Sequence, residues 1–90
     1  MIKKLLDKYF LNKLEVQLSR FFMKYALDVK FVKKTKHYMR VYIKDIKYSE
    51  KEFEEIGVFS IENSFEYLFD FDSVQKNMEK VVKTYREKNK

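Results

Sequence analysis

Residues 37–48 read HYMRVYIKDIKY, and their alternation separates two kinds of side chain. If the segment is a strand, Met39, Val41 and Ile43 share one face, since successive side chains of a strand point to opposite faces. The other face then holds two tyrosines and two cations: Tyr38, Arg40, Tyr42 and Lys44. Exposed rings can stack on bases, and cations between them can neutralise phosphates. The alternation therefore predicts a face that binds DNA or RNA.

Four lysines would extend this face along its edge: Lys30, Lys33, Lys34 and Lys36. They belong to the basic half of the chain, because residues 1–48 carry thirteen basic and four acidic side chains. Residues 49–72 carry one basic and eight acidic side chains, and residues 73–90 carry six and two. Some of this charge is expected to be neutralised by cross-strand pairs. The remaining +6 favours an anionic partner, which a basic surface attracts and orients.

A protein-interaction module fits the composition as well as a nucleic-acid-binding protein does. Nine Phe and seven Tyr in ninety residues are many, and aromatic side chains anchor protein interfaces. Tyr flanked by Arg and Lys is also ordinary on the solvent side of a sheet, where the ring covers its neighbours and the hydroxyl stays hydrated. An inhibitor, adaptor or assembly factor that acts on a partner protein is thus the alternative.

Catalysis by histidine or cysteine is not expected. His37 is the only histidine and the chain has no cysteine, so a zinc site built from these residues is excluded. As a general base, His37 would need an orienting group, for which Asp28 and Asp45 are candidates by strand geometry.

An acid–base or metal site built from carboxylates, or a phosphate-binding loop, is also not expected. The pairs Glu54/Glu55 and Asp70/Asp72 are expected in an acidic solvated segment and at a helix start. Gly57 is the only glycine, which excludes a glycine-rich phosphate loop. We therefore expect a non-enzymatic protein without a cofactor or a metal ion.

The first element that must support the candidate face is a long helix over residues 2–25. Apolar side chains recur there at steps of three and four, which is typical of one helix face. A helix of that length spans about 36 Å, at 1.5 Å per residue, and exceeds the roughly 30 Å diameter of a ninety-residue domain. The helix must bend, overhang or pack against a partner, so we predict self-association as a two-fold homodimer.

A period of two follows and predicts strands. Val29 and Phe31 begin the first strand, residues 33–36 form a hairpin connection, and residues 37–48 form the second strand. Residues 58–61 are predicted as the third strand. In residues 65–71, FEYLFDF, aromatic side chains alternate with Glu66, Leu68 and Asp70, which predicts a fourth.

Two further segments are predicted as helical. Ser49 and Glu52 have the spacing of a capping box and Gly57 could end a helix, so residues 49–57 are predicted as a short helical turn with Phe53 and Ile56 inside, with an acidic hairpin loop as the alternative. Asp72 or Ser73 caps the final helix, whose apolar positions recur at steps of three and four.

The predicted fold is a single α+β domain over residues 1–90, with the order α-β-β-β-β-α. Both long helices pack on one face of an antiparallel sheet of three to four strands. The expected core combines apolar side chains of both helices and the sheet: Leu18, Phe21, Phe22, Val41, Ile43, Phe69, Val81 and Val82.

The composition also indicates the cellular setting of the chain. No stretch approaches the ~18 apolar residues that span a bilayer, so no membrane partner is expected. That feature and the lack of cysteine indicate a cytoplasmic protein. One Gly, no Pro and abundant Lys, Ile, Phe, Tyr and Asn suggest AT-rich coding DNA, as in a phage or plasmid of a low-GC host.

Overall fold

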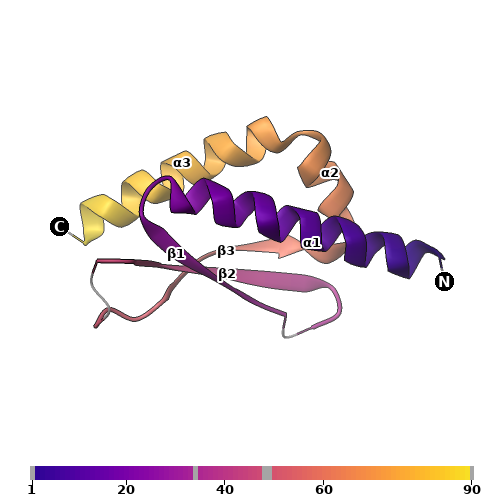
Figure 1. Cartoon of the computed structure of the whole chain (residues 1–90), viewed down its shortest axis with the longest axis horizontal. Coiled ribbons are helices and arrows are strands. Elements are labelled where there is room, and N and C mark those ends of the chain that lie inside the picture. Colours follow the sequence, from indigo (N-terminus) through magenta and orange to yellow (C-terminus); the bar gives the residue numbers. More distant parts are fainter. Residues whose placement is uncertain (1, 34, 48–49, 90) are drawn as a thin grey trace.

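The computed structural model describes residues 2–33, 35–47 and 50–89, and it confirms the α+β class (Figure 1). The elements follow one another along the chain as α1 (Ile2–Met23), β1 (Leu27–Val32), β2 (Tyr38–Asp45), β3 (Glu54–Ser60), the 3-10 turn η1 (Ile61–Asn63), α2 (Ser64–Phe69) and α3 (Phe71–Lys88). The sheet has three antiparallel strands in the order β1-β2-β3. Both long helices lie on one side of this sheet, and no helix of the described residues lies on the other side (Figure 1).

The core lies between the sheet and the helices. Met39, Val41 and Ile43 are fully buried, as their alternation predicts. Leu27 of β1 and Phe59 of β3 are also buried, and the helices supply the rest of the buried core: Leu11, Leu14, Leu18, Phe21 and Phe22 of α1 and Val74, Met78, Val82 and Tyr85 of α3. Each such side chain contributes about 1.5–3 kcal/mol to folding by leaving water. The inner face of the sheet is thereby committed to the core and cannot serve a ligand.

The first helix is one continuous element of 22 residues. Its N-terminal turns extend beyond the sheet in Figure 1, so the predicted excess length appears as an overhang. At its other end, Ala26 adopts φ 57°, and its N–H donates to the Met23 carbonyl at 3.0 Å. This left-handed residue reverses the chain, so that β1 begins at the next residue.

The predicted fourth strand is wrong, because residues 64–69 form α2 and Phe71 begins α3. Alternating aromatic residues mimic a strand, but the side chains packed against the core are Tyr67, Leu68 and Phe71, whose spacing of one and three is helical. Ser64 donates its hydroxyl to the Ile61 carbonyl at 2.7 Å and so begins the helical turn. Phe69, which was expected in the core, is 84% exposed.

The predicted helical turn over residues 49–57 is also wrong. Residues 54–57 belong to β3, which is longer than the predicted strand at 58–61, and Ser49 lies outside the described residues. Pairing with the full length of β2 satisfies more backbone groups than a short helix would. Val41 pairs with Gly57 and Tyr42 with Glu55, so Ile56 is the extra residue of a β-bulge.

The final helix begins earlier than Asp72 or Ser73 would place it. Asp70 is its N-cap: the carboxylate accepts hydrogen bonds from the Ser73 backbone N–H at 3.4 Å and the Ser73 hydroxyl at 2.8 Å.

In the described part of the chain, no helix is both long and apolar enough to cross a bilayer.

Candidate nucleic-acid interface

The outer face of the sheet carries the alternating residues of β2. Because Met39, Val41 and Ile43 point toward the helices, Tyr38, Arg40, Tyr42 and Lys44 point to the opposite side. Tyr38 is 55% exposed as a residue, and the Arg40 side chain is 46% exposed. We call these four residues, together with Lys30 and Phe53, the outer-face cluster.

Lys30 joins the cluster through the register of the sheet. It pairs with Tyr42 across β1 and β2, and its Nζ lies 5.8 Å from the centroid of the Tyr42 ring. The same Nζ lies 5.5 Å from the Phe53 ring centroid, and Lys44 Nζ lies 4.9 Å from it. Two cations and two rings are therefore interleaved on one surface by cation–π contacts.

Phe53 is the residue of this cluster that sequence reasoning missed. It was expected on the inner side of a short helix, whereas it precedes β3 and lies against two lysines of the outer face. Residues 53, 55 and 58 share the outer face, because the bulge at Ile56 adds one residue between 55 and 58. Recognising it requires the position of the bulge, which only the pairing with β2 reveals.

Two carboxylates moderate the positive charge of the outer face. Glu55 Oε1 lies 3.5 Å from Arg40 Nη1, and both side chains are more than two-fifths exposed. Asp28 pairs with Lys44 in the register of β1 and β2, and its carboxylate accepts a hydrogen bond from the Val29 N–H at 3.0 Å. Exposed pairs contribute at most about 1 kcal/mol, so Arg40 remains free to exchange Glu55 for a phosphate.

The three remaining predicted lysines do not behave alike. Lys33 Nζ lies 2.9 Å from Glu15 Oε1 of α1, which draws this side chain toward the helices and away from the outer face. Lys34 lies outside the described residues. Lys36 is exposed in the loop between β1 and β2, beside the Tyr38 end of the cluster.

A shallow hollow of about 270 Å³ lies at that end of the cluster, lined by Thr35, Tyr38, Arg40 and Val58. The Thr35 hydroxyl oxygen accepts hydrogen bonds from the backbone N–H groups of His37 and Tyr38, at 3.2 and 3.1 Å. These bonds hold the loop backbone beside the hollow, where Tyr38 and Arg40 are two of the lining residues.

His37 has a carboxylate partner, but neither of the predicted ones. Its Nδ1 lies 2.8 Å from Glu62 Oε1, whereas Asp28 and Asp45 accept hydrogen bonds from the backbone N–H groups of Val29 and Lys47. Both side chains of the pair are more than half exposed. Since the His37 carbonyl also accepts from the Ile61 N–H at 2.8 Å, this contact joins the start of β2 to η1.

The carboxylates of Glu54 and Glu55 have different partners, on different sides of the sheet. Glu54 and Glu55 alternate across the sheet, so Glu54 pairs with Lys88 of α3 at 3.5 Å while Glu55 faces Arg40. Asp70 is engaged as the cap of α3. Among the residues that the structure describes, no three His, Asp or Glu side chains are grouped to hold a metal ion.

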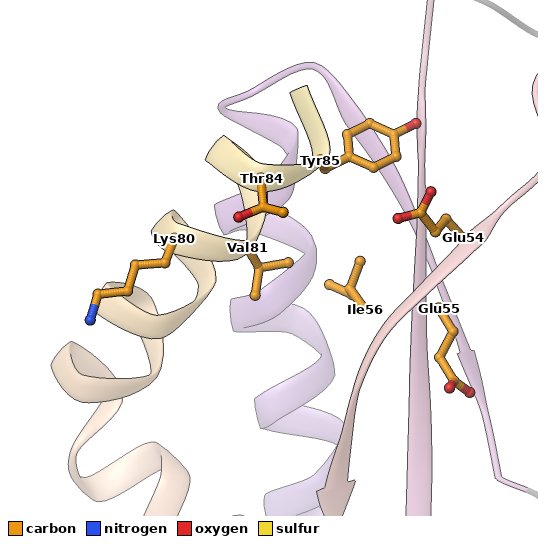
Figure 2. A pocket seen from close by; sticks show the side chains of 7 residues that line it. All are labelled: Glu54, Glu55, Ile56, Lys80, Val81, Thr84 and Tyr85. Atoms are coloured by element: carbon orange, nitrogen blue, oxygen red, sulfur yellow. The ribbon is translucent and has the colours of Figure 1, made fainter. Parts of the chain in front are cut away.

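A second hollow, of about 300 Å³, lies between β3 and α3 (Figure 2). Ile56, Val81 and Tyr85 line it, and Figure 2 shows the Lys80 ammonium pointing away from it. The Tyr85 hydroxyl already accepts a hydrogen bond from the Asp45 N–H at 3.1 Å. Glu54, Glu55 and Thr84 also line it, and the two carboxylates already pair with Lys88 and Arg40, so we assign no role to this hollow.

Comparison with known proteins finds no matching protein family, no similar curated protein and no similar solved structure.

Proposed function

We propose that this protein binds nucleic acid through the outer face of its sheet. The observation that carries the proposal is the outer-face cluster itself: three aromatic residues interleaved with Lys30, Arg40 and Lys44 on a sheet surface without a covering helix. Exposed rings on a sheet are a platform on which bases stack, and neighbouring cations neutralise the backbone.

The members of the cluster have different expected roles. Tyr38 has the most exposed ring and borders the hollow beside Arg40, so it is the ring on which we place a base. Tyr42 and Phe53 are half-buried, and lysines already contact them. These two rings hold Lys30 and Lys44 in place, which positions the cations for phosphates before any ligand arrives.

Fluorescence anisotropy with labelled single- and double-stranded DNA and RNA, at ~50 mM salt, tests the proposal in a regime where weak phosphate contacts are visible. Binding should weaken with salt, with a slope near −0.7 per phosphate contact on a single strand. Arg40→Glu should reduce affinity and flatten this slope. Lys80→Glu makes the same charge change on the exposed surface of α3 and is the matched control.

Two outcomes would contradict the proposal. If none of the oligonucleotides binds, the outer face is ordinary sheet surface, and a protein partner becomes the favoured class. If Lys80→Glu and Arg40→Glu weaken binding equally, attraction is due to net charge rather than to the outer face.

A further inference from the structure

A row of four aromatic rings crosses from α1 to α2 on the helix side of the molecule. The ring centroids of Tyr9 and Phe10 are 5.5 Å apart, those of Phe10 and Phe65 are 5.0 Å apart, and those of Phe65 and Phe69 are 6.0 Å apart. We call these four residues the ring row. It does not depend on the outer-face cluster, because it is built from different elements.

Most of the ring row is exposed to solvent in the single chain. Tyr9 is 54% exposed, Phe65 is 51% exposed and Phe69 is 84% exposed. Leu5 and Leu6, one turn earlier on α1, add exposures of 72% and 47%. Monomeric proteins rarely present so many contiguous apolar groups unless a partner covers them.

The exposed apolar residues of α1 include ones on the side of the helix opposite the core. Leu18 faces the core and is fully buried, whereas Tyr9 lies nine residues away, which is half a rotation around the helix axis. The N-terminal half of α1 thus carries apolar groups on the side away from the core as well as toward it. On a surface helix that has no partner, the side away from the core is normally polar.

The two ends of the ring row carry opposite charge. At the α2 end, Glu66, Asp70 and Asp72 are exposed, and residues 61–75 contain no basic side chain. At the α1 end, Lys8 and Lys13 are exposed, and Lys13 Nζ lies 5.4 Å from the centroid of the Tyr9 ring.

A patch with an acidic end and a basic end is complementary to itself after a half-turn. A two-fold axis through its middle sets the acidic end of one copy against the basic end of the other, and it does so twice. A polyanion, an anionic bilayer or an acidic protein would be repelled by the α2 end. We infer that the occupant of the ring row is a second copy of this chain, in an isologous dimer.

In that dimer the ring rows of the two copies pack against each other. The apolar groups supply the buried centre, and the charged ends select the antiparallel orientation. Both outer sheet faces stay uncovered, so the inference stands or falls separately from nucleic-acid binding.

Sedimentation equilibrium over a range of concentrations measures the association. The expected mass is twice the 11.2 kDa of one chain at the upper end of the range. A mass of one chain at every concentration up to ~1 mM would overturn the inference, because any specific dimer should form there.

Phe69→Ala tests where the two copies meet. It should weaken association by about thirtyfold or more, because the most exposed ring of the row loses its contact with the second copy. Because Phe69 is so exposed, the variant should keep its fold, which circular dichroism verifies. Met23→Ala, 61% exposed at the far end of α1, is the control and should leave association unchanged. An unchanged dimer in Phe69→Ala would place the contact elsewhere and overturn the inference.

A charge-exchange pair tests the two-fold arrangement. Lys13→Glu and Glu66→Lys should each associate more weakly than the natural chain, because each variant sets like charges against each other twice. An equimolar mixture should associate more tightly than either variant alone, since both contacts then become attractive. A mixture no tighter than its components would overturn the antiparallel arrangement.

Discussion

Lys44 Nζ lies 4.9 Å from the centroid of the Phe53 ring and joins β2 to the residue that precedes β3. Lys30, from β1, reaches the same ring at 5.5 Å. One half-buried ring therefore gathers cations from two strands on the uncovered face of the sheet. We expect this contact to affect stability and, if the outer face binds nucleic acid as we propose, to hold both cations in place before the ligand arrives.

The Lys44–Phe53 contact should be measurable as a coupling energy. We expect a double-mutant cycle of Phe53→Leu and Lys44→Met to give ~0.5–1 kcal/mol, since leucine keeps apolar area but lacks the ring quadrupole. Denaturant unfolding of the four proteins provides the numbers. The same cycle with Lys80 in place of Lys44 should give no coupling. Additive effects of Phe53→Leu and Lys44→Met would show that the contact contributes nothing.

Leu18 of α1 is the clearest test of the core. Leu18→Ala should lower the free energy of unfolding by ~2–5 kcal/mol, because the side chain is fully buried and its loss leaves a cavity. Val16→Ala, where the residue is 48% exposed, should change stability by no more than about 0.5 kcal/mol in the monomer. Thermal melts at low protein concentration compare the two. Equal melting temperatures for the two variants would refute the assigned faces of α1.

Long periodic segments were predictable because burial imposes their pattern. The alternation of β2 separates the buried Met39, Val41 and Ile43 from the outward residues, as the structure confirms. The steps of three and four in α1 and α3 likewise place Leu18, Phe22 and Val82 in the core. In these elements one face must leave water, so the sequence period and the structure agree.

Residues 65–71 were predicted wrongly because their pattern fits both periods. Aromatic side chains at every second position indicate a strand, while Tyr67, Leu68 and Phe71 pack with helical spacing. The choice depends on distant partners: the Tyr67 hydroxyl accepts from the Ser60 N–H at 3.2 Å, and its ring meets Phe59 edge-on at 5.0 Å. No local pattern contains that information.

The sequence predicted which face of the strand carries the candidate site, but not which side chains contact one another there. The alternation assigned Tyr38, Arg40, Tyr42 and Lys44 to one face, whereas the direction of Lys33 toward Glu15 depends on how α1 crosses the sheet. The place of Phe53 depends in the same way on the bulge in β3. Which group a long side chain contacts depends on residues that only the tertiary structure brings close to it.

The cap of α3 should contribute measurably to stability. Asp70→Ala removes the acceptor of the Ser73 N–H and hydroxyl, and should lower the free energy of unfolding by about 1 kcal/mol. Asp70→Asn keeps an acceptor oxygen and should retain most of it. Asp72→Ala, in the first turn, removes only a favourable charge and is the control, with an expected loss of ~0.3–1 kcal/mol. A larger loss in Asp72→Ala than in Asp70→Ala would move the cap to Asp72.

A substitution in the turn between α1 and β1 should stabilise the protein. Ala26 holds φ 57°, a conformation that costs a residue with a Cβ roughly 1–2 kcal/mol. Arg86 of α3 donates to the neighbouring Tyr25 carbonyl, which helps to hold this turn in place. Ala26→Gly should therefore raise the free energy of unfolding by about 1 kcal/mol in chemical denaturation.

Gln17→Gly, at an exposed position inside α1, provides the contrast to Ala26→Gly. It should lower the free energy of unfolding by about 1 kcal/mol, because glycine is unfavourable within a helix. A loss of stability in both variants would mean that the turn does not require the left-handed conformation.

Tyr38 separates the binding and packing roles of the outer face. If its ring stacks on a base, Tyr38→Ala should weaken oligonucleotide binding by ~1–3 kcal/mol, whereas Tyr38→Phe should bind nearly as well. The salt dependence should hardly change, because no phosphate contact is lost. Stability should also be almost unaffected, since Tyr38 is 55% exposed and is the first residue of β2. Anisotropy titrations and thermal melts on the same preparations separate these effects. A Tyr38→Ala protein that melts earlier but binds as the natural chain does would make the ring a packing group and shift the stacking role away from this end of the cluster.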